Sequence, residues 1–79
     1  MNKAEKRVAE VKAVSIIYGS AVSQAEWIEG RIDGLKKCIE SELELNANAN
    51  TEFYERDIEE LTVELKAYEK IAEHLLKLM

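Results

Sequence analysis

The 79-residue sequence has no proline, only three glycines and a single cysteine, Cys38. Turns and strand ends depend on proline and glycine, so their scarcity beside abundant Glu, Lys, Ala and Leu predicts an all-α protein. A lone cysteine cannot form an intrachain disulfide, and we expect Cys38 to be a packed, reduced thiol. A chain this short builds a marginal core by itself, which makes oligomerisation the remaining common source of stability.

Long apolar runs are also missing, because none approaches the roughly 20 residues of a membrane span and the first residues lack the apolar segment of a secretory signal. We therefore expect a cytoplasmic protein without membrane contact. The net charge of −5 argues against direct nucleic-acid binding, which needs clustered Lys and Arg. The only histidine, His74, has no partner for a catalytic or metal site, and phosphate-binding glycine loops are absent, so we predict no enzyme, no cofactor and no metal.

The part of the sequence that carries the strongest pattern is residues 11–39. Small or apolar residues recur there in alternating steps of three and four, as in a helix that packs on a partner along its length. They are Val11, Val14, Tyr18, Ala21, Ala25, Ile28, Ile32, Leu35 and Ile39.

Two interpretations of this region differ at Gly19 and Ser20. In the first, one helix runs from about residue 2 to about 45 with Asn2 as its cap, because the pattern keeps its phase across the glycine. In the second, Gly19 ends a first helix and Ser23 with Glu26 forms a capping box for the next, which gives a three-helix bundle that could be monomeric. Phase continuity favours the single long helix.

The alternating asparagines of residues 46–50 predict a turn, since asparagine competes with the backbone for hydrogen bonds. Asn50 or Thr51 then caps a last helix over about residues 51–79. Its apolar positions repeat in the same way: Tyr54, Ile58, Leu61, Leu65, Tyr68, Ala72, Leu75 and Met79. The prediction is one domain, residues 1–79, folded as a long antiparallel helical hairpin of coiled-coil type that assembles into an oligomeric bundle.

Length matching predicts where the oligomer forms. A last helix of this length reaches back along the first only to about residue 17 or 18, which leaves the apolar residues before that point in water. Another copy of the chain is the natural cover, and a dimer is favoured. The candidates for the oligomer interface are Val8, Val11, Val14, Ile16, Ile17 and Tyr18.

A second line of mostly small residues lies opposite the main pattern at helical spacing: Ala13, Ile16, Ser20, Ser23, Trp27, Gly30 and Gly34. Small residues allow another backbone to approach closely. Trp27 is the only tryptophan, and tryptophan often anchors protein interfaces. Either line could receive the last helix while the other serves an oligomer or partner, and the sequence leaves this choice open.

Acidic residues concentrate on both sides of the turn. Residues 40–64 contain nine acids and one base, Arg56, which gives 1 − 9 = −8 for this segment. Three of the glutamates lie near a helix C-terminus, where the backbone dipole favours cations instead. Together with Trp27, the candidates for partner binding are Glu40, Glu42, Glu44, Glu52, Glu55, Asp57, Glu59 and Glu60.

These features predict a small protein-binding helical module, an adaptor or an inhibitor that docks on a larger protein complex. Bacteriophage and mobile-element genes are rich in such products, so a phage protein acting in the host cytoplasm against a host or defence protein is one form of this hypothesis. One alternative is an acidic mimic of nucleic acid that blocks a DNA-binding or RNA-binding protein. Another is a purely structural assembly subunit. A small ligand between the helices of an oligomer also remains open.

Overall fold

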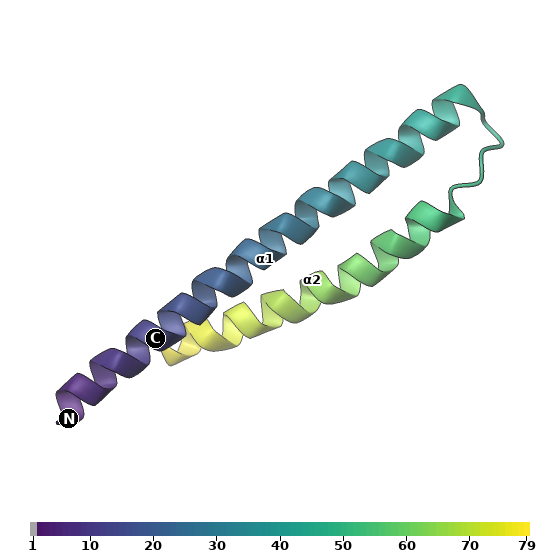
Figure 1. Cartoon of the computed structure of the whole chain (residues 1–79). Helices are drawn as coiled ribbons and strands as arrows, with labels where there is room; N and C mark the ends of the chain where they lie inside the picture. The colour runs from purple at the N-terminus through teal and green to yellow at the C-terminus, as the bar shows by residue number, and fades with distance from the viewer. Residues whose placement is uncertain (1) are drawn as a thin grey trace.

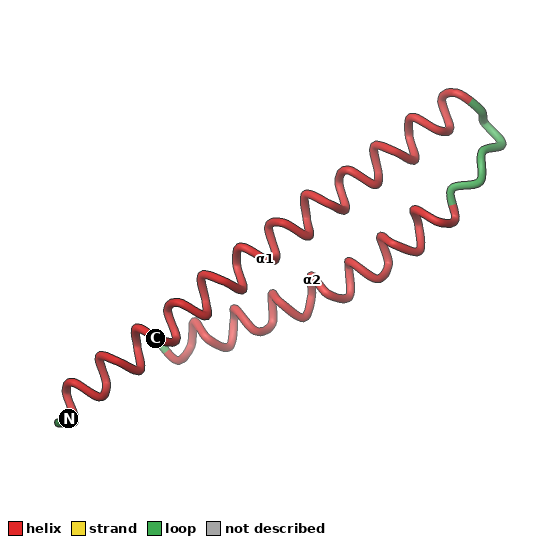
Figure 2. Tube along the Cα trace, in the orientation of Figure 1, coloured by secondary structure: helices red, strands yellow, loops and turns green. Residues whose placement is uncertain are grey.

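The computed structural model describes residues 2–79 as two antiparallel helices that pack side by side (Figure 1). Helix α1 spans Lys3–Leu45 and helix α2 spans Glu52–Leu78, and residues 46–51 join them as the only loop between helices in this part of the chain (Figure 2). The rod measures 66 × 15 × 14 Å. The predicted all-α helical hairpin is confirmed.

Helix α1 runs through Gly19 and Ser20 without a break, so the three-helix alternative is wrong. A glycine inside a helix costs only about 1 kcal/mol relative to alanine. On both sides of Gly19 the apolar positions face the same partner helix, and a break there would have to interrupt that packing. The capping signal of Ser23 and Glu26 is therefore overridden by tertiary contacts.

Asparagine side chains hold the helix ends and the turn. Asn2 Oδ1 accepts a hydrogen bond from the Glu5 amide at 2.9 Å, as expected for the cap of α1. In the turn, Asn46 Oδ1 accepts from the Asn48 amide at 3.0 Å. Asn50 Oδ1 accepts from the Glu52 amide at 3.1 Å, whereas Thr51 makes no side-chain cap. Of the two predicted caps for the last helix, Asn50 is the one that makes a hydrogen bond.

The main apolar pattern of α1 receives α2, which answers the question that the sequence leaves open. Four side chains are buried among residues 2–79, namely Ala21, Ile28, Ile32 and Leu35, and Ile28 is only 2% exposed. All the predicted packing positions of α2 except Met79 are half-buried. The core is thus one narrow seam between two helices, and the opposite side of α1 has no partner within the described chain.

Helix α2 reaches farther along α1 than its length predicts. Leu78 lines a hollow together with Arg7, Glu10, Val11 and Val14. The expectation that Val14 lies uncovered is wrong, because it is half-buried beside the end of α2. The prediction compared backbone levels alone and left out the reach of the side chains at the end of α2. Only the first turns of α1 project past α2 (Figure 1).

Candidate functional site

One surface without a partner in the described chain is the side of α1 that faces away from α2. It consists of residues that alternate in steps of four and three and are all exposed, and we call it the outer face: Ala9, Ala13, Ile16, Ser20, Ser23, Trp27, Gly30 and Gly34. Ile16 is 73% exposed and Trp27 is 63% exposed. No charged residue occupies this line over its whole length. An exposed uncharged line of this length with two large apolar side chains is typical of a protein-binding surface.

The glycines of α1 serve no purpose within the hairpin. All three lie in the helix with ordinary negative backbone φ, and a Cβ added at any of them would meet nothing within 4 Å. Alanine would therefore stabilise the helix at each position without a clash. Gly30 and Gly34 belong to the outer face, where the absence of a side chain leaves the α1 backbone open to close approach by another element.

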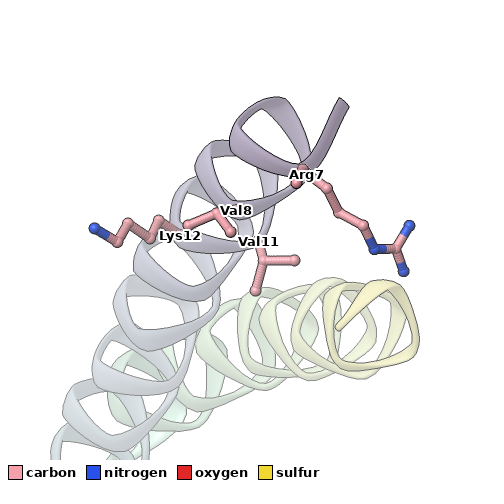
Figure 3. A pocket seen from close by; sticks show the side chains of 5 residues that line it. Arg7, Val8, Val11 and Lys12 are labelled. Carbon is pink, nitrogen blue, oxygen red and sulfur yellow. The ribbon is translucent and has the colours of Figure 1, made fainter. Parts of the chain in front are cut away.

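A second apolar surface lies on the projecting turns of α1. Ala4, Arg7, Val8, Val11 and Lys12 line a shallow hollow there. Figure 3 shows Val11 pointing toward the end of α2, with Arg7 and Lys12 extending to opposite sides of it. Val8 is 56% exposed and Val11 is 40% exposed. We call these first turns the projecting segment.

The six residues proposed for the oligomer interface do not form one surface. Val8 and Val11 belong to the projecting segment, whereas Ile16 lies on the outer face. Ile17 is 53% exposed. Val14 and Tyr18 are half-buried members of the seam with α2. Their common role in an oligomer stays a prediction. The structure divides five of them among three environments and leaves Ile17 outside all three.

The acidic residues gather at the turn end of the rod, where both helices begin or finish. Seven of the eight candidate acids are exposed, and Asp57 is half-buried. The only ion pair among residues 2–79 joins Lys77 Nζ to Glu73 Oε1 at 3.9 Å, at the other end of α2. The acidic end therefore presents its negative charge to solvent without neutralisation by salt bridges within the described chain. The acid-rich range of the sequence predicts this surface. The hairpin places the acids at the end of α1 beside those at the start of α2.

One contact at the acidic end was not predicted from the sequence. The Tyr54 hydroxyl of α2 donates a hydrogen bond to Glu42 Oε1 of α1 at 3.1 Å. This bond and the negative charge of Glu42 raise the pKa of Tyr54 above its ordinary value, with smaller contributions from desolvation and Cys38. The rings of Phe53 and Tyr54 meet edge to face, with centroids 6.0 Å apart.

We expect Glu42→Gln to lower the pKa of Tyr54 toward its ordinary value, because the amide removes the charge that opposes formation of tyrosinate. The pKa of Tyr54 is raised in the folded chain, so its contribution to stability is present below the ordinary tyrosine pKa and is lost as pH rises through the folded value. Ultraviolet difference titration measures this, with Tyr54→Phe identifying the signal among the three tyrosines. Glu44→Gln is the control, because it also removes one negative charge but leaves the hydrogen bond between Tyr54 and Glu42 intact. An equal change in the pKa of Tyr54 in both variants would contradict the assignment to Glu42.

Other exposed side chains differ from the expectations. Cys38 is exposed, not packed, because the seam passes through Leu35 and Ile39 and leaves the position between them in solvent. Leu45 at the end of α1 is 90% exposed, and Val63 on α2 is 70% exposed. These last two carry no periodic signal that could have marked them in the sequence.

Within residues 2–79 no group of three or more His, Cys, Asp or Glu side chains is placed to hold a metal ion. In the same part of the chain, neither helix combines the length and apolar character needed to cross a membrane. His74 is exposed on α2. No protein-family model, no curated protein and no solved structure matches this chain.

Proposed function

We propose that the chain is a non-enzymatic helical module that acts by binding another protein, in the cytoplasm and as a homo-oligomer. The observation that carries this proposal is the outer face of α1, an uncharged line with Ile16 73% and Trp27 63% exposed and with α2 on the opposite side. Two packed helices present this face as a rigid surface, so little conformational entropy is lost on binding. An adaptor or an inhibitor of a larger complex, including one encoded by a phage, is the form of function that this surface suits.

Capture from an extract of the source cell tests the proposal. We expect the tagged chain to retain one foreign protein in stoichiometric amount. Trp27→Ala removes the largest exposed anchor, and truncation of such an anchor costs about 2 kcal/mol or more, roughly a thirtyfold loss of affinity. Val63→Ala, which shortens another exposed apolar side chain on α2, is the matched control and should capture as well as wild type.

Circular dichroism of each variant shows whether helicity is retained. Loss of capture by Trp27→Ala with unchanged helicity supports partner binding. Capture at the wild-type level both by Trp27→Ala and by a triple charge reversal of Glu40, Glu42 and Glu44 would contradict it. A chain that retains only its own copies is a structural assembly subunit instead.

The acidic end supports a second candidate function, a mimic of the nucleic-acid backbone. Its glutamates are exposed, and no ion pair among the described residues neutralises them. Binding of a DNA-binding or RNA-binding protein to this end would weaken steeply with salt and would compete with nucleic acid. An affinity that stays constant between roughly 50 and 500 mM salt would reject the mimic.

A further inference from the structure

We propose that the outer face of α1 binds the outer face of a second copy of the chain, with the two α1 helices antiparallel. This inference rests on the proposed function, because it places a second copy on the surface already assigned to protein binding. A foreign partner then reaches Trp27 only after the two copies separate. The outer face keeps its alternation of four and three from Ala9 to Gly34, about 38 Å of helix. More than three heptads of such spacing suffice for a coiled-coil seam.

The order of residues along the outer face is symmetric about its midpoint. A two-fold interface requires that if one residue contacts another in the partner, the reverse contact also occurs. With the axis midway between Ser20 and Ser23, Ser20 lies level with the partner's Ser23, and Ile16 lies level with the partner's Trp27. The two large exposed side chains of each copy therefore meet one another, while the small serines occupy the centre.

The same register accounts for the glycines. Ala13 lies level with the partner's Gly30, and Ala9 lies level with the partner's Gly34. Nothing within the hairpin lies within 4 Å of a Cβ at either glycine, although glycine destabilises a helix relative to alanine. Pairing alanine with glycine lets the two helix backbones approach closely. This close approach explains why glycine, and not alanine, occupies positions 30 and 34.

In this register, charged residues beside the outer face lie near residues of opposite charge in the partner. Within one copy the same residues are too far apart to pair. Glu10 comes within about two residues of being level with the partner's Arg31, and Lys12 does the same with the partner's Asp33. Two-fold symmetry repeats each pair, which gives four. In a single copy Lys12 and Asp33 lie about 32 Å apart along α1, and neither has an ion-pair partner among residues 2–79. A parallel, in-register dimer would place Trp27 on the partner's Trp27 and leave Lys12 beside the uncharged Ile17.

The ends of the chain fit the same arrangement. The next position at each end of the outer face is a lysine, Lys6 or Lys37, and these would face one another, so the close contact ends there. In this register Lys3 lies level with the partner's Glu40, the first residue of the acidic segment.

Light scattering coupled to size exclusion over a dilution series tests the inference. We expect a mass of twice 9.0 kDa for the wild-type chain. Lys12→Asp or Asp33→Lys places like charges opposite one another twice in each dimer and should weaken the dimer Kd about tenfold. The double variant Lys12→Asp/Asp33→Lys exchanges the charges and should restore the wild-type Kd to within about threefold.

Lys66→Asp is the control, because it reverses an exposed charge on α2 away from the outer face and should leave the Kd unchanged. All three substituted positions are exposed, and circular dichroism shows whether the hairpin is retained. A 9.0 kDa mass at every concentration overturns the inference, as does a double variant that is no tighter than the single ones. Capture of a foreign partner by a monomeric chain would overturn this dimer and still support the proposed function, so the two can fail separately.

Discussion

Ile28→Ala is expected to lower the free energy of unfolding by about 2–5 kcal/mol. Ile28 is the most buried large side chain among residues 2–79, with 2% exposure, and lies in the middle of the seam with α2. Only four side chains are buried among the described residues, so Ile28 supplies a large share of the buried apolar surface. A domain of this length is stable by roughly 4–12 kcal/mol, and the loss is therefore a large fraction of the total. Urea unfolding followed by circular dichroism measures it.

Ile71→Ala makes the same chemical change at a position that is 46% exposed on α2. Much of this side chain already contacts water, so the loss should stay near 1 kcal/mol or below. Both variants are compared with wild type at one protein concentration, which keeps any contribution of self-association equal. Equal losses in the two variants would show that the seam through Ile28 does not hold the hairpin together.

Gly19→Pro is expected to lower the free energy of unfolding by about 3 kcal/mol or more, because proline inside a helix removes one backbone hydrogen bond and clashes with the preceding turn. Gly19 lies in the interior of the 43-residue helix α1. The first turns of α1 should lose helicity together, and with them the packing of α2 on Val14. Circular dichroism at low temperature measures the lost helicity, and urea unfolding measures the lost stability.

Gly19→Ala is the control at the same position. Its Cβ meets nothing within 4 Å, so the variant should be more stable than wild type by up to about 1 kcal/mol. A chain broken at Gly19 would behave in the opposite way, tolerating proline in its loop. A neutral Gly19→Pro would therefore contradict the continuous helix.

The sequence predicts the hairpin because its apolar residues keep one phase from Val11 to Ile39 and again from Tyr54 onward. Periodicity of that length indicates tertiary packing, since it places one side of the helix against the same partner over many turns. The capping box at Ser23 is a preference of one helical turn. The packing of α1 on α2 before and after this turn outweighs it. Asn50 and Thr51 are harder to separate, because both residues suit a cap and only the backbone geometry decides between them.

The sequence is less informative about the surfaces. Trp27 and the acidic residues are recognisable from composition and spacing alone, but which line of α1 receives α2 depends on the summed burial of both helices. The contact between Tyr54 and Glu42 depends on how the turn sets the two helices against one another, and no spacing within one helix encodes it. Cys38 lies beside the seam, and the prediction that it is packed there is wrong because the seam between two helices is too narrow to cover it.

The rod shape of the hairpin governs how the protein behaves in solution. Its Cα radius of gyration is 18.9 Å, whereas a compact domain of the same length would have roughly 12 Å. A compact protein with the larger radius would contain about 290 residues. A single copy therefore tumbles slowly about its short axes and leaves a gel-filtration column ahead of a compact protein of the same mass. Its translational friction is set by the length of α1 more than by the number of atoms.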